Sequence, residues 1–443
     1  MKTKKFTLIL ITLIIFIIPL CTFKTTNIEI DSSPAEITHV TSTDVDFPIY
    51  SEGAVLMDSS TGKVLYGKNE NEKLYPASTT KILTAIIAIE KYNLNDKVKA
   101  NNSALVAIPS GYSSAAIQAD ESLTVQELLE LFLIHSANEV GYIFAEDISG
   151  SVDDFAVLMN QKASEIGCKN THFTNPSGIH NPNHYSTPYD MALIAKYCMK
   201  NETFRNIVSM TSCTIEATDK YEKRYFKNTN DLIDPKSKYY YENAIGIKTG
   251  FTSQAKNCLI AGSKKDNTEL ITVVLGAEAT EDGRSGRYVD TINLFDYAFS
   301  NYKVQQIAAK NTSIENLTIE NATKDTKNLS LLLKDNVSAL TPMDFDLSNL
   351  NYTVDLNDNI SAPITEGYVL GKITYDIDGI KYSTDLIADH SVEEYNFPIL
   401  AVQIALAIIV LLLLIKLFFF RKNKRKKRGK RYKSYDDYMY KFN

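Results

Sequence analysis

The chain of 443 residues is poor in cysteine. Its five cysteines contain no Cys-x-x-Cys pair and follow no regular spacing. Cys21 lies at the end of an apolar N-terminal segment that we expect to be removed, and the other four need not pair. A domain of this size can bury enough apolar surface without cross-links, so we expect no disulfide framework.

Histidine is also scarce, with six residues. His180 and His184 are four residues apart, as metal ligands can be, but Pro182 lies between them and no His-Glu-x-x-His motif is present. We interpret both as structural or substrate-loop residues and expect neither a metal nor an organic cofactor. One stretch resembles a phosphate loop, but Met57 and Val64 occupy positions that require Gly and Ser or Thr, so nucleotide binding is not expected.

Positive charge is scarce in the middle of the chain. Residues 31–396 contain 31 Lys and Arg but 50 Asp and Glu, a net charge of −19, whereas the whole chain carries −6. A nucleic-acid-binding protein needs a basic face on its folded part, so this class of partner is excluded. The content of 44% hydrophobic and 23% charged residues is ordinary for two or three globular domains.

The N-terminus has the pattern of a secretory signal. Three lysines in the first five residues precede the apolar run 6–18, which a proline ends. We expect residues 1–26 to form a signal peptide, with an uncleaved N-terminal anchor as the alternative. Residues 27–47 are rich in Thr, Ser, Asp and Glu and are expected to form a flexible leader.

The C-terminal segment predicts a membrane anchor. Residues 397–415 contain no charged residue, and four apolar residues follow Lys416. Because about 20 apolar residues cross a bilayer, we expect residues 397–420 to form a transmembrane helix. A basic block begins at residue 421, which predicts that the tail 421–443 is cytoplasmic and the folded part lies outside the cell.

Strand patterns lie at both ends of the region 48–303, with a mainly helical stretch between them. The expected strands are residues 53–58, 63–66, 244–250, 258–262 and 270–276. A helix over residues 286–301 is expected to close the domain. This order predicts an α+β domain with one antiparallel sheet, completed by both ends of the domain, and a helical insert. Residues 304–392 predict a small β-rich domain.

Residues 75–89 predict a buried helix with a polar first turn. Pro76 suits the entry to a helix, and Leu, Ala and Ile then follow without a polar face. Ser78 and Lys81 are three residues apart and share one face near the positive end of this helix. A hydroxyl beside a partly desolvated amine is typical of nucleophilic catalysis. Three further Ser-x-x-Lys pairs lie in a turn, a loop and a helix end, which do not fix a nucleophile: Ser60/Lys63, Ser253/Lys256 and Ser300/Lys303.

Two further motifs follow in the chain. Residues 136–138 read Ser-Ala-Asn after a second apolar helix, expected over 123–134, and residues 248–250 read Lys-Thr-Gly on an expected strand. Ser-x-x-Lys, Ser-x-Asn and Lys-Thr-Gly in this order are typical of serine penicillin-binding proteins and class A β-lactamases. The three motifs together therefore predict one catalytic site.

Lys81 is the candidate base for Ser78, because the sequence shows no evident Ser-His-Asp set. Its pKa must fall from about 10.4 to about 7, which burial and a second cation, Lys248, could supply. Ser136 can relay a proton between Lys81 and the leaving amine. Asn138 offers both a donor and an acceptor to a substrate amide.

The Lys-Thr-Gly strand is the candidate substrate-binding edge. Lys248 and Thr249 suit a terminal carboxylate, and Gly250 lets a substrate backbone lie against the strand. The backbone amides of Ser78 and Phe251 are the candidate oxyanion-hole donors.

At these motifs the chain resembles the low-molecular-weight penicillin-binding D-alanyl-D-alanine carboxypeptidases. The resemblance covers roughly residues 45–392 and includes residues 76–81, 171–178, 184–192 and 246–252. It implies a DD-peptidase/β-lactamase-like fold, an acyl-enzyme on Ser78, release of the terminal D-alanine of peptidoglycan stem peptides, and inhibition by β-lactams such as penicillin. It also implies that residues 304–392 lift the active site off a bacterial cell membrane.

The chain departs from the family pattern at three places. Glu139 stands where Asp is more usual, and Lys256 follows Ala255 where Gly is common. The predicted anchor is a full membrane span, whereas this family often uses an amphipathic C-terminal helix.

We therefore predict a membrane-anchored, extracytoplasmic serine-type D-Ala-D-Ala carboxypeptidase. A β-lactamase is the nearest alternative, but no Glu-x-x-Leu-Asn loop that would activate a deacylating water follows Ser136. A non-catalytic wall-binding or sensor protein on the same fold is the other alternative, and the intact Ser78, Lys81, Ser136 and Lys248 argue against it. The sequence leaves the oligomeric state open.

Overall fold

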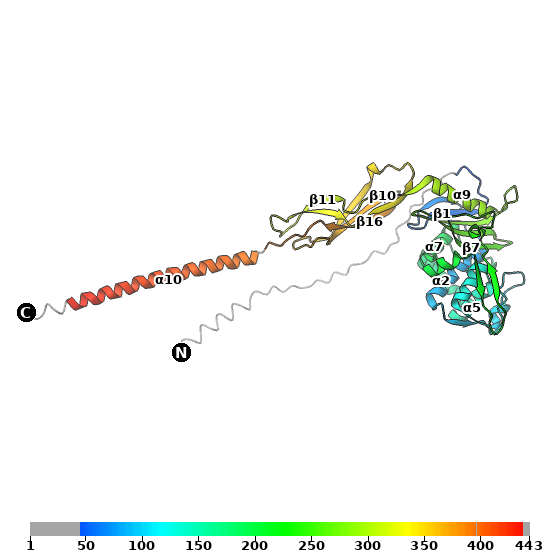
Figure 1. The fold of residues 1–443 in the computed structure, drawn as a ribbon, viewed down its shortest axis with the longest axis horizontal. Coiled ribbons are helices and arrows are strands. Elements are labelled where there is room, and N and C mark those ends of the chain that lie inside the picture. The colour runs from blue at the N-terminus through cyan, green and yellow to red at the C-terminus, as the bar shows by residue number, and fades with distance from the viewer. Residues whose placement is uncertain (1–44, 396, 437–443) are drawn as a thin grey trace, which may run out of the picture. The chain divides into compact units, whose positions relative to one another are not determined.

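The computed structural model describes residues 45–395 and 397–436. The predicted signal peptide, most of the predicted leader and residues 437–443 of the predicted tail lie outside the described residues. Two compact parts rich in β-structure precede a long C-terminal helix along the chain, and each part is described by itself (Figure 1).

A five-stranded antiparallel sheet forms the centre of the first part. Its strands are β1 (Gly53–Asp58), β2 (Val64–Lys68), β7 (Ala244–Thr252), β8 (Lys256–Lys265) and β9 (Thr268–Ala277). Their order is β2-β1-β9-β8-β7, so β1 from the start of the domain pairs with β9 near its end. This confirms the predicted sheet completed by both ends, and it leaves β7 at one edge.

The insert between β2 and β7 is mainly helical, as predicted. Its helices are η1 (Ala77–Thr80), α2 (Lys81–Lys91), α3 (Asn102–Val106), α4 (Val125–Glu130), η2 (Leu131–His135), α5 (Asn138–Ser149), α6 (Val152–Ile166), α7 (Pro188–Met199), α8 (Glu202–Val208) and η3 (Asp231–Ile233). It also contains two small antiparallel sheets that the sequence reading did not predict: β3 (Lys97–Lys99) with β4 (Ser122–Thr124), and β5 (Ser212–Ile215) with β6 (Arg224–Lys227).

The central sheet separates two apolar cores. Side chains alternate between the faces of a strand, so Val55 and Met57 of β1 face the helical insert while Ala54 and Leu56 face the opposite side. Helix α9 (Gly286–Asn301) covers that opposite side, where Phe295 is fully buried. Figure 1 shows α9 on one side of the sheet and α2, α5 and α7 on the other. The result is a three-layer arrangement of helix, sheet and helices, which confirms the predicted closing helix.

The second apolar helix begins later than predicted. Residues 123–124 belong to β4, and the helix starts at Val125 because Thr124 forms a capping box with Glu127. The Glu127 N–H donates to Thr124 Oγ1 at 3.2 Å, and Glu127 Oε2 accepts from the Thr124 N–H at 2.8 Å. The helix ends in the π-turn η2, after which Ser136 adopts a left-handed conformation with φ 68°.

The second part of the chain is built of strands, as predicted. They are β10 (Tyr302–Ala308), β11 (Ser313–Thr318), β12 (Asn328–Leu333), β13 (Val337–Pro342), β14 (Asn351–Leu356), β15 (Val369–Ile377) and β16 (Ile380–Ala388), with a short helix η4 (Leu347–Asn349). Five form a sheet in the order β11-β12-β16-β15-β14, and β10 pairs with β13. A separate apolar core, which includes Leu329, Leu331, Ile373 and Leu386, stabilises this part.

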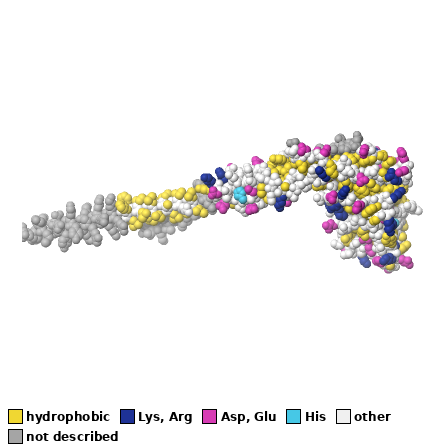
Figure 2. Space-filling model, turned by 45° about the horizontal axis from the view of Figure 1, so that its top comes forward, with side chains coloured by type: hydrophobic (Ala, Val, Ile, Leu, Met, Phe, Trp, Pro, Cys, Tyr) yellow, Lys and Arg dark blue, Asp and Glu magenta, His cyan; other side chains and the backbone are white. Residues whose placement is uncertain are grey.

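The C-terminal helix α10 (Phe397–Asp436) has the length and composition of a membrane span. Its stretch Ile399–Phe420 has 22 residues and a mean hydropathy of 2.9, and none of it is buried against the protein. At about 1.5 Å per residue it would cover about 33 Å, close to the apolar thickness of a bilayer. Figure 2 shows hydrophobic side chains along this stretch. This helix suggests membrane anchoring.

Candidate active site

The predicted nucleophile lies in a tight turn at the start of a buried helix. Ser78 is in the 3₁₀ turn η1, which follows Pro76, and α2 begins at Lys81. The Thr79 N–H and hydroxyl both donate to Pro76 O, at 3.2 and 2.6 Å, which closes the turn. Ala77 takes a positive φ of 47° within it. The turn exposes the Ser78 side chain partly, while the body of α2 is buried.

Lys81 contacts the nucleophile directly. Its side chain is fully buried, and Nζ donates to Ser78 Oγ at 2.9 Å, to Asn138 Oδ1 at 2.8 Å and to Ser177 O at 2.7 Å. These acceptors favour the charged ammonium. Burial opposes it more strongly, and the positive charge of Lys248 adds to this effect, so the pKa of Lys81 falls well below its usual 10.5. A lysine with a lowered pKa can accept the proton of Ser78.

The Ser-Ala-Asn motif forms a second side of the site. Ser136 lies between the π-turn η2 and α5 with 6% of its surface exposed, and Asn138 is the first residue of α5. Both ends of the Asn138 amide bind protein groups: Oδ1 accepts from Lys81, and Nδ2 donates to Ser113 O at 2.8 Å. One N–H and one lone pair of this amide remain for another partner.

Strand β7 forms the third side. Lys248 is 1% exposed and its Nζ donates to Thr249 O at 3.1 Å. Burial, followed by the charge of Arg287, lowers the pKa of Lys248 to about 7. The hydroxyls of Thr249 and Thr229 are 2.6 Å apart. Because β7 is an edge strand, its outer side offers backbone groups to a further chain.

Two glycines allow the three sides to approach. A Cβ on Gly250 would lie 3.1 Å from Ser78 N and 3.1 Å from Pro76 O, so only a glycine lets β7 lie against the nucleophile turn without a shift. Gly178 has a φ of +79°, and a Cβ there would lie 1.8 Å from Ala77 O. The loop that supplies Ser177 O to Lys81 therefore packs directly behind the nucleophile turn.

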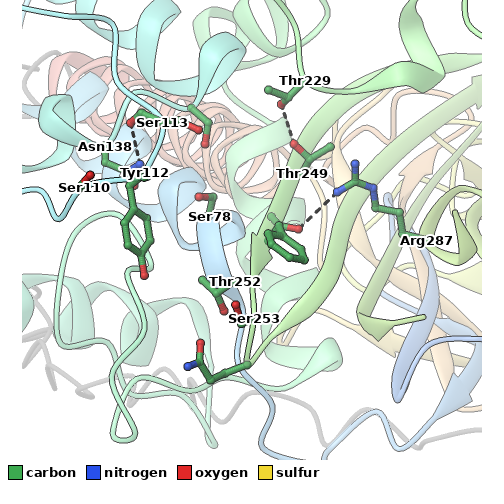
Figure 3. Close-up of a pocket in the computed structure, with 15 residues that line it drawn as sticks. Ser78, Ser110, Tyr112, Ser113, Asn138, Thr229, Thr249, Thr252, Ser253 and Arg287 are labelled. Carbon is green, nitrogen blue, oxygen red and sulfur yellow. Dashed lines mark hydrogen bonds between the residues drawn. The ribbon is translucent and has the colours of Figure 1, made fainter. Parts of the chain in front are cut away.

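The three sides enclose one cavity of about 530 Å³, shown in Figure 3. Ser78 lies at its centre, Tyr112 points in from one side, and Thr249 and Arg287 lie on the other. The lining residues are Ser78, Ser110, Gly111, Tyr112, Ser113, Ser136, Asn138, Thr229, Thr249, Gly250, Phe251, Thr252, Ser253, Gln254 and Arg287. A hydroxyl nucleophile, a buried amine and a cationic rim suit acyl transfer from an anionic substrate.

Two stretches of the chain match known families. Residues 39–279 match the family described as D-alanyl-D-alanine carboxypeptidase, and residues 302–394 match the C-terminal domain of penicillin-binding protein 5. The chain belongs to the D-alanyl-D-alanine carboxypeptidase family. Membership confirms the predicted family and fold class, and it confirms the predicted activity, that of a serine hydrolase.

Individual relatives agree with this assignment. The chain is similar to D-alanyl-D-alanine carboxypeptidase DacF of Bacillus subtilis, with 36% identity over 335 residues, 74% of this chain and 82% of the relative. Its structure is similar to that of penicillin-binding protein 5 from Haemophilus influenzae, with a TM-score of 0.62 and 28% identity, covering 80% of this chain and all of the other. PBP3 from Streptococcus pneumoniae shares the fold, with a TM-score of 0.67 at 24% identity over 78% of this chain and all of the other.

The carboxypeptidase fold brings all the predicted site residues together. Six of them line the cavity: Ser78, Ser136, Asn138, Thr249, Gly250 and Phe251. Lys81 and Lys248 lie behind this lining and are buried. Of the look-alike pairs, Ser60 donates to Asp58 Oδ2 at 2.8 Å in a turn, and Lys256 pairs with Glu52 and Glu278 although Ser253 lines the cavity.

Several residues that line or support this cavity were not predicted from the sequence. Arg287 comes from α9, which was predicted only as a closing helix. Its Nη1 lies 3.4 Å from Gly250 O, and its guanidinium stacks 4.8 Å from the Tyr288 ring. Thr229 and Tyr112 come from loops without a motif. Asn175 lies in a stretch that resembles the family, but no role was predicted for it. Its Oδ1 accepts three backbone N–H groups, from residues 177, 178 and 179, and an Asn-Pro-Ser-Gly turn is the signal that could have found it.

The two histidines considered as metal ligands lie near the back of the nucleophile turn. His184 is 2% exposed, and burial lowers its pKa to about 3, so the ring is neutral. Its Nε2 lies 2.9 Å from Thr80 Oγ1, and its Nδ1 accepts the Thr174 N–H at 3.1 Å. The His180 ring packs edge-on against Tyr75. In the described part of the chain, no group of three His, Cys, Asp or Glu side chains could hold a metal ion.

Proposed function

We propose that Ser78 is the nucleophile with which this chain removes the terminal D-alanine from peptidoglycan stem peptides. The observation that supports this most directly is the 2.9 Å contact between Ser78 Oγ and the Nζ of the fully buried Lys81. When Lys81 is neutral, it accepts the Ser78 proton while Oγ attacks the carbonyl carbon of the penultimate residue. The backbone N–H groups of Ser78 and Phe251 receive the oxyanion.

Collapse of the tetrahedral intermediate releases D-alanine and leaves an ester on Ser78. The proton taken by Lys81 passes through the Ser136 hydroxyl to the leaving amine. Water then attacks the ester, with Lys81 again as base, and the free Ser78 hydroxyl returns. Ser78 attacks the strained amide of a β-lactam in the same way and becomes acylated, so penicillins inhibit the enzyme.

The C-terminal carboxylate of the substrate is bound by the cationic side of the cavity. Lys248 supplies positive charge from below the lining, and Thr249 offers a hydroxyl. Arg287 adds a fixed planar donor group that suits a carboxylate. The peptide preceding the scissile bond lies along the free edge of β7, beside Gly250.

We also propose that α10 anchors the enzyme in a bacterial cell membrane with the catalytic part outside. The basic block that begins at residue 421 follows the apolar stretch directly, and such blocks are retained on the cytoplasmic side. The C-terminal β-rich part then stands between the anchor and the catalytic part in the chain.

The test combines fluorescent penicillin labelling with D-alanine release from a pentapeptide ending in D-Ala-D-Ala. Wild type should form a covalent adduct and release D-alanine, and Ser78→Ala should do neither. Ser60→Ala is the matched control, since it removes a serine from another Ser-x-x-Lys pair, and it should retain both activities. Rapid penicillin hydrolysis without D-alanine release would instead identify a β-lactamase. Absence of labelling in wild type, with wall fragments bound equally by Ser78→Ala, would identify a receptor.

A further inference from the structure

The cavity wall opposite β7 has little internal support. It is formed by Ser110, Gly111, Tyr112 and Ser113, in the loop between α3 and β4. Most of these residues are exposed, and the Tyr112 N–H reaches Pro109 O only at 3.5 Å. A short loop with such weak bonds depends on contacts at its ends for its position.

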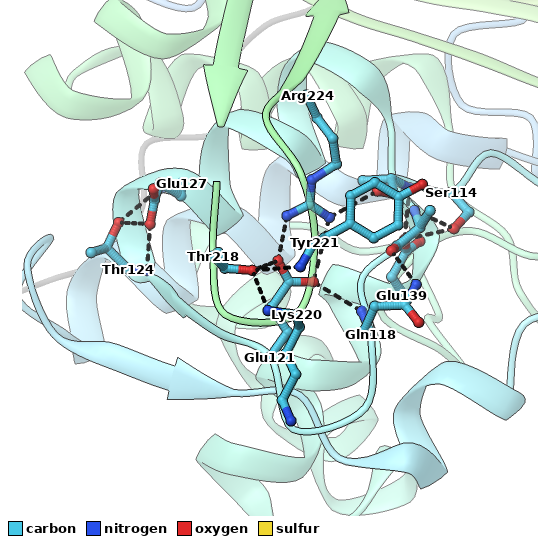
Figure 4. Close-up of polar contacts among 12 residues, drawn as sticks. Ser114, Gln118, Glu121, Thr124, Glu127, Glu139, Thr218, Lys220, Tyr221 and Arg224 are labelled. Atoms are coloured by element: carbon cyan, nitrogen blue, oxygen red, sulfur yellow. Dashed lines mark hydrogen bonds and ion pairs between the residues drawn. The ribbon is translucent and has the colours of Figure 1, made fainter. Parts of the chain in front are cut away.

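Hydrogen bonds to Glu139 and Arg224 fix the peptide units on both sides of Ala115, which lies two residues after the end of the wall. Ala115 is 1% exposed. Its N–H donates to Glu139 Oε1 at 2.7 Å, and its carbonyl accepts from Arg224 Nη1 at 3.2 Å. The Ser114 hydroxyl donates to the same Glu139 oxygen at 2.7 Å. Figure 4 shows Glu139 with Ser114, and Arg224 reaching the same region from the opposite side.

The groups that hold Ala115 are buried charges. Glu139 is 2% exposed, and the side chains of Arg224 and Glu121 are 7% and 0% exposed. Arg224 Nη2 forms an ion pair with Glu121 Oε1, and Glu121 Oε2 accepts the Gln118 N–H at 2.9 Å. Hydrogen bonds to ionised groups are shorter and stronger than neutral ones. Buried charges are expensive to leave without partners, so the bonds that Glu139 Oε1 and both Nη groups of Arg224 do form are costly to break. Glu139 Oε2 and Arg224 Nε are buried without a hydrogen-bond partner in the described part of the chain.

Glu121, Glu139 and Arg224 together form a clamp that joins three segments of the chain. Glu139 lies on α5, Arg224 on β6, and Glu121 immediately before β4. None of the three lines the cavity. On the cavity side, Asn138 binds Ser113 O through both its backbone N–H at 2.9 Å and its Nδ2 at 2.8 Å. The wall is therefore held between Asn138 and the clamp.

We propose that Glu139 and Arg224 are positioning residues that set the separation between the wall 110–113 and strand β7, and thereby control the affinity for the peptide substrate. Ser78 and Lys81 belong to η1 and α2, and no hydrogen bond joins either residue to Arg224 in the described part of the chain, so changes at Arg224 largely spare the chemical step. The charge of Glu139 raises the pKa of Lys81, so variants of Glu139 are judged by KM alone. The inference rests on the proposed function in one respect only, namely that the cavity binds a peptide ending in D-Ala-D-Ala.

The test is Arg224→Lys, assayed for D-alanine release from the pentapeptide. Lysine keeps the charge, but its donors all lie on one nitrogen, so it cannot reproduce the planar arrangement in which separate Nη groups bind Glu121 and the Ala115 carbonyl. We expect KM to rise about ten-fold with kcat within about two-fold, as for loss of binding common to ground and transition states. Glu139→Gln, which keeps an acceptor but loses its charge, should raise KM in the same direction.

Arg205→Lys is the matched control. Arg205 also bridges a glutamate and a backbone carbonyl, Glu269 and Met199 O, but it does so from α8 outside the cavity lining. It should lower the melting temperature without changing KM. An unchanged KM in folded Arg224→Lys and Glu139→Gln, or an equal rise in Arg205→Lys, would overturn the proposal. If Arg224→Lys does not fold, Glu139→Gln decides by the same criterion. Failure of wild type to release D-alanine would instead refute the proposed function.

Discussion

Replacing Gly250 by alanine should impair acylation without destabilising the protein. The added Cβ would lie 3.1 Å from both Ser78 N and Pro76 O, several tenths of an ångström closer than ordinary contacts. Both of these atoms belong to the backbone of the nucleophile turn, which cannot rotate away as a side chain would. The turn or the strand must therefore shift, and the backbone amides of Ser78 and Phe251, which we propose as the oxyanion donors, move apart.

The size of the effect follows from the oxyanion hole. Removing one oxyanion donor costs about 10²–10³ in rate, and a partial displacement costs a fraction of that free energy. We expect the second-order rate of penicillin acylation to fall by about 10- to 100-fold. The strand backbone at Gly250 has no positive φ, and alanine restricts the unfolded chain, so stability should change by less than about 1 kcal/mol.

Gly262→Ala is the matched control for this experiment. Gly262 lies on β8 of the same sheet, and its Cβ would lie 2.8 Å from Cγ1 of Ile245, so alanine forces a local shift at a contact that does not involve the nucleophile turn. Stopped-flow acylation with a fluorescent penicillin should show a rate near wild type for Gly262→Ala. An acylation rate of Gly250→Ala within two-fold of wild type would refute the argument that β7 and the nucleophile turn are held at contact distance.

Three further predictions concern charge and loop structure. Lys248→Gln removes a cation that depresses the pKa of Lys81, so that pKa should rise and the acid limb of the acylation–pH profile should move to higher pH. The shift should be largest below pH 7, where Lys248 is charged, and an unmoved limb would contradict the coupling. Arg287→Gln should lower kcat/KM for the pentapeptide about 10- to 100-fold, as loss of one charge-assisted bond implies, yet leave a substrate with an amidated C-terminus unaffected. Equal losses for both substrates would place Arg287 away from the carboxylate. Asn175→Ala should reduce the free energy of unfolding by about 2–4 kcal/mol in urea denaturation, because two buried N–H groups and one partly buried N–H group lose their acceptor. A loss under 1 kcal/mol would mean that water replaces the side chain.

The sequence predicts the centre of the site better than its rim. The proximity of Ser78, Lys81 and Lys248 could be predicted because each motif lies on an element with a clear apolar pattern. Arg287 could not be found in this way, since its position depends on α9 packing over β8 and β9, which brings its first turn to Gly250 of β7, and no local pattern encodes this contact. The start of α4 was misplaced because the apolar run continues through β4, and the capping box of Thr124 and Glu127 set the boundary instead.

The wall of the cavity shows the same limit. Glu139 was noticed only as a departure from a family pattern, and nothing local to Arg224 indicates that it binds the Ala115 carbonyl. Both roles arise where α5, β6 and the loop after α3 meet. Contacts of this kind depend on the packing of distant segments, whereas helix caps, turns and strand alternation depend on residues that are neighbours in the sequence.

The pairing of β1 with β9 has a consequence for when the catalytic part can fold during synthesis. Val55 of β1 pairs with Val273 of β9. The sheet therefore cannot be completed until β9, its last strand along the chain, has been synthesised. Until then the hairpin β1–β2 has an open edge, and β7 and β8 have no link to it. A chain emerging N-terminus first cannot hold Ser78 against Gly250 until almost the whole catalytic part is present. The loop that this pairing closes is long, so assembly is slow compared with local helix formation. The active site therefore cannot be complete while the chain is still being synthesised.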